Sequence, residues 1–111
     1  MRNERSLEDI KYILKDIKAV LENIYTGRLV SVILYGSFAK NKATEESDID
    51  IAVVLKGTVD KIREIDRIHD SIYSLGLEHD ELISVNPLSE EELKDTEWPL
   101  YYHIQREGIK V

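Results

Sequence analysis

The sequence contains no cysteine, only two prolines among 111 residues, and no apolar run near the ~20 residues that cross a membrane. The absence of cysteine excludes disulfides and thiolate metal sites, and it fits a reducing compartment. The N-terminal stretch MRNERSLEDIKYILKDI lacks the uninterrupted apolar segment of a signal peptide. We therefore expect a cytoplasmic protein with no membrane partner.

Basic residues are also comparatively few, with 15 lysines and arginines against 22 aspartates and glutamates, a net charge of −7. This balance argues against a broad contact with a nucleic-acid backbone, which needs clustered lysine and arginine. Metal ions or a basic protein partner suit such a surface better. The length and the 42% apolar fraction predict one globular domain over residues 1–111.

Hydrophobic periodicity predicts an α/β (α+β) fold, with a small mixed sheet of three to four strands flanked by helices. Helices are expected from Ser6 to Tyr25, over a short stretch opened by GSFAK, from Thr58 to Gly76, after the capping box of Ser89 and Glu92, and from Pro99 to Gly108. In the third of these, the residues expected to face inward are Val59, Ile62, Ile65, Ile68, Ile72 and Leu75. Strands are expected at 29–36, where a glycine closes the strand, at 48–55 and at 79–85.

Gly36 closes the first predicted strand, and Ser37 directly follows it. A glycine there allows a ligand to approach the main chain closely. The N–H groups of a following helix suit phosphate, and the Ser37 hydroxyl adds a donor. The turn is therefore a candidate phosphate site.

Asp48 and Asp50 begin the next strand, so their side chains project from one face. Two such charges repel each other, and burying either one unpaired is costly, which predicts a cation between them. Mg²⁺ is usually held by one or two carboxylates plus substrate phosphates. Together with Gly36 and Ser37, the pair predicts a nucleoside triphosphate site. Two metal ions there would stabilise the attacking and leaving oxygens of an in-line displacement.

Gly36-Ser37, ten residues, then Asp48-Ile49-Asp50 resembles the signature of the DNA polymerase β-like nucleotidyltransferase superfamily, particularly its minimal nucleotidyltransferase (MNT) branch. The resemblance covers nearly the whole chain and implies a single-domain polymerase β-like fold. It also implies ATP on the Gly36-Ser37 turn and three carboxylates holding two Mg²⁺ ions, of which Asp48 and Asp50 are the first two. Asn41 stands where the motif usually has a second glycine, and asparagine tolerates a left-handed backbone.

The resemblance implies that the third carboxylate lies on the next strand, as a metal ligand or as the general base for an attacking hydroxyl. The segment GLEHDELISV offers Glu78, Asp80 and Glu81. We favour Asp80, because it shares a face with Leu82 and Ser84 and precedes the apolar run. Glu81 and then Glu78 are the alternatives.

The resemblance further implies a partner, a HEPN-domain RNase toxin, which an MNT antitoxin modifies by transferring AMP from ATP to a tyrosine. The chain leaves no room for an acceptor-binding domain, so we expect a homo- or hetero-oligomer in which the partner supplies that surface. Its acidity would complement a basic partner. One alternative is a non-catalytic nucleotide-binding module that neutralises the partner by complex formation. Another is an antibiotic-modifying nucleotidyltransferase that acts as a homodimer.

Overall fold

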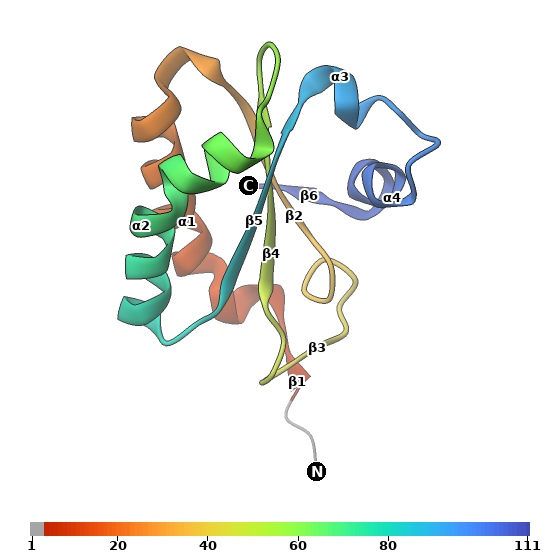
Figure 1. Ribbon diagram of the computed structural model, residues 1–111. Coiled ribbons are helices and arrows are strands. Elements are labelled where there is room, and N and C mark those ends of the chain that lie inside the picture. Colours follow the sequence, from red (N-terminus) through yellow and green to blue (C-terminus); the bar gives the residue numbers. More distant parts are fainter. Residues whose placement is uncertain (1–3) are drawn as a thin grey trace.

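The computed structural model describes residues 4–111, and residues 1–3 of the predicted domain lie outside the described part. A four-stranded sheet with the order β5-β4-β2-β6 forms its centre (Figure 1). Strands β2 (Leu29–Tyr35) and β4 (Ile49–Leu55) are antiparallel, and β5 (Ile83–Ser89) runs parallel to β4. The short β6 (Ile109–Lys110) pairs antiparallel with β2. This mixed sheet confirms the predicted fold class.

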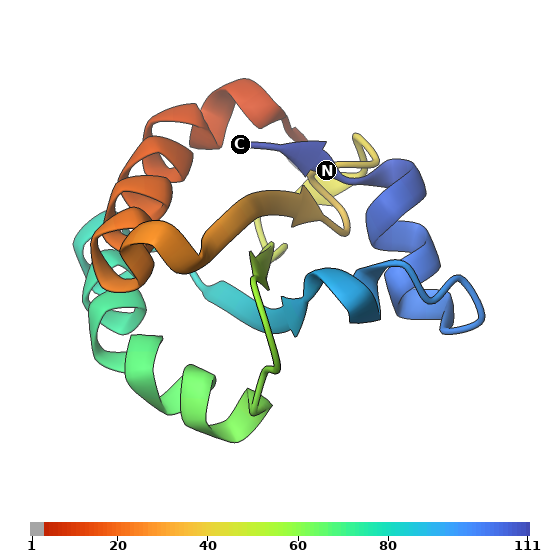
Figure 2. The ribbon, with the colours of Figure 1, turned by 90° about the horizontal axis from the view of Figure 1, so that it is seen from above.

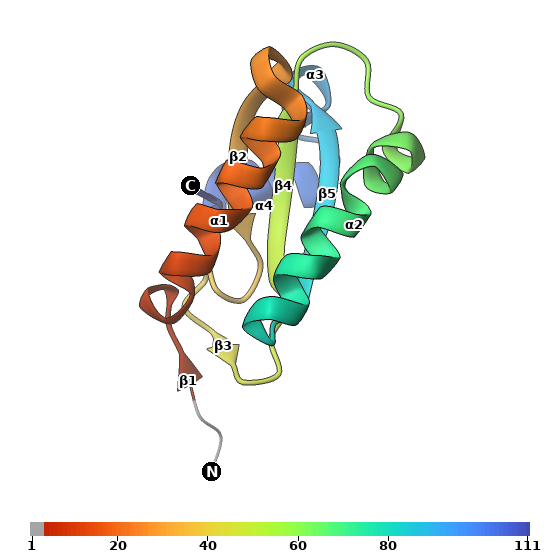
Figure 3. The same cartoon turned by 90° about the vertical axis from the view of Figure 1, so that its left-hand side faces the viewer.

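Helices cover both faces of the sheet. Helices α1 (Leu7–Tyr25) and α2 (Lys61–His79) pack side by side on one face (Figure 3). Helix α4 (Pro99–Glu107) lies across the other face, preceded by the single turn α3 (Glu90–Leu93), as seen from above in Figure 2. None of the helices in the described part of the chain is both long and apolar enough to cross a membrane.

Three short elements complete the chain. A 3₁₀ turn, η1 (Thr26–Arg28), links α1 to β2. Strands β1 (Glu4–Arg5) and β3 (Ala43–Thr44) form a separate two-stranded sheet at the end of the molecule where β4 begins (Figure 1).

Strand β4 is buried on both faces, which explains its continuous run of apolar residues. Ile49, Ile51 and Val53 belong to the larger hydrophobic cluster, together with the buried residues of α1 and α2. Ala52 and Val54 point the other way and pack in a smaller cluster that includes residues of α4. The face that carries Asp50 is therefore the α4 face of the sheet.

Several predicted boundaries are confirmed by their caps. The Ser6 N–H donates to Asp9 Oδ2 at 2.8 Å as α1 begins. Ser89 and Glu92 form the predicted capping box, with two hydrogen bonds of 3.0 Å. Pro99 opens α4, and Gly108 follows its last residue.

The prediction for α2 was wrong at both ends. The Asp60 side chain accepts from the Arg63 N–H, so the helix begins at Lys61 rather than at Thr58. This start sets the helical phase, and Ile62 and Ile65, predicted to face inward, are 82% and 42% exposed. The helix also continues past Gly76 to His79.

The next strand consequently begins at Ile83 rather than at residue 79. The predicted helix after Gly36 is also absent, because residues 36–41 form a turn and a bend.

Glu64 is a buried carboxylate on the inner side of α2, with only 3% of its surface exposed. It accepts hydrogen bonds from the Tyr25 hydroxyl at 2.8 Å, from Arg67 Nε at 2.9 Å and from Arg28 at 3.2 Å. Burial alone would raise the pKa of Glu64, but these three donors outweigh it and lower that pKa. The network ties α1, α2 and the start of β2 together at the end of the sheet away from β1 and β3.

Candidate functional site

Asp50 lies in the middle of three neighbouring strands. Its Cα is paired with Tyr35 at the end of β2 and with Ser84 near the start of β5. Asp48 precedes β4 by one residue. The end of β2 and the beginnings of β4 and β5 therefore meet at one place, near the small β1–β3 sheet (Figure 1).

Gly36 is in direct contact with Asp50. Its φ is +75°, and a Cβ at this position would collide with the Asp50 carboxylate. An L-residue would thus be strained by its backbone and blocked by its neighbour. The sequence needs glycine here because the backbone passes against the Asp50 carboxylate. The approach of a ligand to this turn stays a prediction.

The turn after Gly36 is closed by its own backbone. The Lys40 N–H donates to the Gly36 carbonyl at 3.1 Å, and the Lys42 N–H donates to the Ser37 carbonyl at 2.9 Å. Asn41 adopts a left-handed conformation with φ +59°, as expected of the residue at the position of a second glycine. Phe38 is buried and anchors the turn in the core, which leaves Ser37 half-buried at the bend.

Burial raises the pKa of the Asp50 carboxyl above its usual value, and the neighbouring Asp48 raises it further. The two carboxylates therefore repel each other as the sequence predicted. A divalent cation would relieve that repulsion. Two hard oxygen donors beside a glycine-serine turn fit Mg²⁺ that also binds phosphate.

The structure does not join a third acid to this pair. Among residues 4–111, no three histidine, aspartate or glutamate side chains lie close enough to hold a metal ion. Asp80 follows the last residue of α2 with a left-handed φ of +54°. It lines a cavity of about 450 Å³ together with Tyr73, Leu77 and Leu82. Its role as third ligand stays a prediction.

The two alternatives to Asp80 are also placed elsewhere. Glu78 is exposed on the last turn of α2. Glu81 is largely buried in an ion pair in which both of its oxygens accept from Arg5.

Sequence reasoning missed the contribution of Arg5. Its guanidinium lies 5.2 Å from the centre of the Phe38 ring, so one residue contacts both Glu81 and the turn after Gly36. No local sequence signal predicts this contact, because Arg5 and Glu81 are 76 residues apart.

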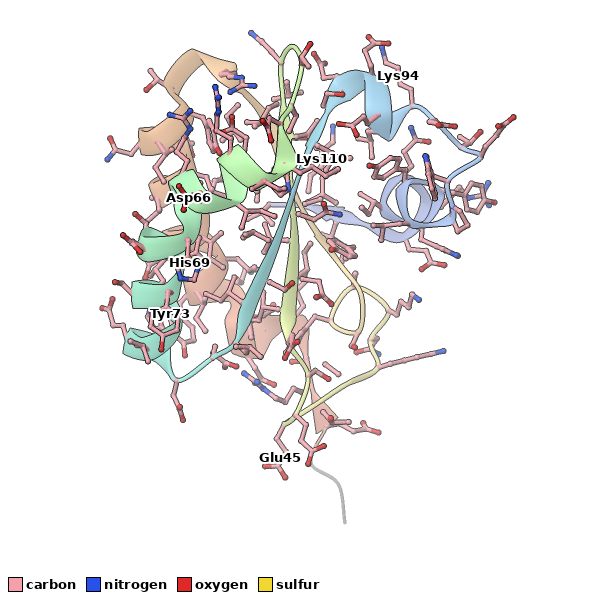
Figure 4. The ribbon with its side chains drawn as sticks, viewed as in Figure 1. Glu45, Asp66, His69, Tyr73, Lys94 and Lys110 are labelled. Carbon is pink, nitrogen blue, oxygen red and sulfur yellow. The ribbon has the colours of Figure 1, made fainter. Side chains whose placement is uncertain are left out.

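Several other polar residues behave as ordinary surface groups. Lys40 lies 3.5 Å from Glu107 of α4. Glu45 is at the tip between β3 and β4 and points away from the molecule (Figure 4). His69 is on the outer side of α2, where it stacks on Tyr73 with ring centres 5.8 Å apart.

A glycine-serine turn set against two carboxylates on a small mixed sheet is the arrangement expected of a nucleotidyltransferase. The family model "Polymerase beta, Nucleotidyltransferase" matches residues 15–111. The chain belongs to this nucleotidyltransferase family.

Two similar proteins of Methanocaldococcus jannaschii support this assignment. "Putative protein adenylyltransferase MJ0604" is 35% identical over 86% of this chain and 90% of its own length. "Putative protein adenylyltransferase MJ0141" is 35% identical over 70% of this chain and 74% of its own length.

Solved structures share the fold. A crystal structure of a toxin-antitoxin with AMP-PNP is 23% identical with a TM-score of 0.60, over 88% of this chain and 70% of that one. A mutant of the toxin-antitoxin MntA-HpeT is 22% identical with a TM-score of 0.60, over 87% and 70% of the two chains. The predicted nucleotidyltransferase family is confirmed by the family model, and these structures confirm the predicted fold.

Proposed function

We propose that this protein transfers AMP from ATP to a hydroxyl group of a partner protein. The observation that carries this proposal is the contact between the Gly36 backbone and the Asp50 carboxylate, with Asp48 beside it. This contact brings a candidate phosphate-binding turn and a candidate metal-binding pair into one site, as nucleotidyl transfer requires.

In the proposed reaction the acceptor oxygen forms a bond with the α-phosphorus of ATP, and the bond from that phosphorus to pyrophosphate breaks. The acceptor hydroxyl passes its proton to solvent water as it attacks. Asp48 and Asp50 would hold Mg²⁺, which would neutralise charge on the phosphates. The Gly36 backbone and the Ser37 hydroxyl bind the part of the triphosphate that leaves.

For the acceptor we propose a tyrosine of a HEPN-domain RNase toxin in the cytoplasm, so that the protein is an antitoxin and forms a hetero-oligomer. Similar proteins carry the name protein adenylyltransferase, and proteins of the same fold were solved as toxin-antitoxins, one with AMP-PNP. The net charge of −7 favours encounter with a basic, RNA-cleaving partner.

A second candidate function is neutralisation by complex formation without transfer. The observation that favours it is that no third acid joins Asp48 and Asp50 among the residues described. A general base typically contributes ~10²–10⁴-fold to a rate. A site without one would bind nucleotide but transfer AMP slowly.

A labelling assay separates the two functions. It measures the transfer of AMP to a co-expressed HEPN partner from ATP that is labelled at the α-phosphate. We expect the wild-type protein to label the partner and the double variant D48A/D50A to label none. The double variant D66A/D70A is the matched control, because it removes the same charge from two exposed positions of α2. Asp66 is labelled in Figure 4. If D48A/D50A protects cells from the toxin as well as the wild type does, complex formation is the function.

A further inference from the structure

The strand beside Asp50 offers neutral side chains to the site. Strand β5 runs parallel to β4, with Ser84 paired to Asp50 and Asn86 paired to Ala52. The pairing extends one residue earlier, since the Ile49 N–H donates to the Leu82 carbonyl at 2.9 Å. Neighbouring strands are about 4.8 Å apart, so paired side chains on one face are adjacent.

Alternation along β5 decides which residues face the aspartates. Ile83 and Val85 pack against the larger hydrophobic cluster under α1 and α2. Ser84 and Asn86 therefore face the side of Asp50. Neither carries a charge, and Ser84 occupies the position directly beside Asp50.

The acids that flank β5 are held in other places. Glu81 is an odd number of residues from Ser84, so strand alternation would put it on the opposite face. Its carboxylate forms an ion pair with Arg5. Asp80 lies two residues before Leu82, but there the chain ends a helix instead of continuing the strand. Asp80 is itself the left-handed residue that ends α2. Its backbone conformation would have to change to bring its carboxylate to Asp48 and Asp50.

We propose that the site binds one divalent cation rather than two. Asp48 and Asp50 hold this cation, and the Ser84 hydroxyl takes the place of a third carboxylate ligand. This inference rests on the proposed nucleotidyl transfer. One Mg²⁺ needs only one or two carboxylates when phosphates and water complete its shell. A second cation about 4 Å away would draw on protein carboxylates in addition to the phosphate oxygens, because the two ions repel each other. On the Asp50 side, β5 offers Ser84 and Asn86 and no carboxylate.

Counting bound Mn²⁺ by electron paramagnetic resonance, at saturating non-hydrolysable ATP analogue, tests the proposal. The wild type and S84A should bind one ion per chain, and S84D, which places a carboxylate beside Asp50, should bind two. S84D should also raise AMP transfer by about tenfold or more, because it adds a third acid that can accept the acceptor's proton. Unfolding midpoints of the variants verify that each remains folded.

Two ions on the wild type would overturn the one-cation site and leave the nucleotidyltransferase function standing. If D80N then bound one ion, Asp80 would be the third ligand. No Mn²⁺ on the wild type in the presence of the analogue would overturn the proposed function together with this inference.

Discussion

Gly36 and Gly57 form a natural matched pair for testing the contact between the turn and Asp50. Both have a positive φ, +75° and +77°, so alanine should cost about 1–2 kcal/mol of folding free energy at either position. A new Cβ at Gly57 meets nothing within 4 Å, whereas at Gly36 it collides with the Asp50 carboxylate. Only G36A therefore displaces a side chain that we propose to bind metal.

We expect G57A to lose stability while keeping its affinity for Mg²⁺ and a non-hydrolysable ATP analogue. G36A should lose at least as much stability and also bind the analogue at least about tenfold more weakly, about 1.4 kcal/mol. Urea unfolding gives the stabilities, and titration calorimetry gives the affinities. Equal analogue affinity in the two variants would refute the idea that the turn and Asp50 form one site.

Two carboxylates should respond to pH in opposite directions. Folding raises the pKa of Asp50. Its favourable contribution to stability is therefore present below the usual pKa of 3.8 and is lost as pH rises through the raised pKa of the folded state. At pH 7 without metal, D50N should therefore be more stable than the wild type. Mg²⁺ with the analogue should reverse this order. Because folding lowers the pKa of Glu64, its contribution is present at neutral pH and lost as pH falls through that lowered pKa. E64Q should therefore lower the free energy of unfolding by about 2 kcal/mol at pH 7. The loss is this moderate because the two arginine partners of Glu64 are partly exposed. In acid the loss should be smaller. Urea unfolding across pH checks both signs, and an E64Q protein as stable as the wild type at pH 7 would contradict the second.

The parts of the fold that were predictable are those with dense local signals. Helix α1 has apolar residues at regular helical spacing and a polar cap, and β2 and β4 are rich in β-branched and other apolar residues. The placement of Asp48 and Asp50 followed from the two-residue period of a strand, and the structure sets Asp50 against Gly36. Asn41 was expected to tolerate a left-handed backbone, and it adopts one.

The errors came from signals that tertiary contacts overrode. Gly76 resembles a helix end, but it is buried where α2 meets the chain that returns to the sheet, and the Glu81 N–H donates to its carbonyl at 2.9 Å. Asp80 instead supplies the left-handed residue that ends the helix. The next strand consequently begins later than predicted, and Ser84 of that strand is paired with Asp50.

The two-residue strands β1, β3 and β6 carry no periodicity of their own. They exist because distant segments pair with them, as Arg5 does with Ala43 and Ile109 with Leu34. The contact of Arg5 with Glu81 and Phe38 depends on the same long-range pairing, so periodicity in the sequence could not reveal it.

A crystal of the protein soaked with Mg²⁺ and a non-hydrolysable ATP analogue tests the central claim most directly. The account predicts phosphate oxygens against the Gly36 backbone and the Ser37 hydroxyl, with a metal ion between them and the carboxylates of Asp48 and Asp50. An analogue bound elsewhere, with both aspartates turned into solvent and without metal, would contradict it.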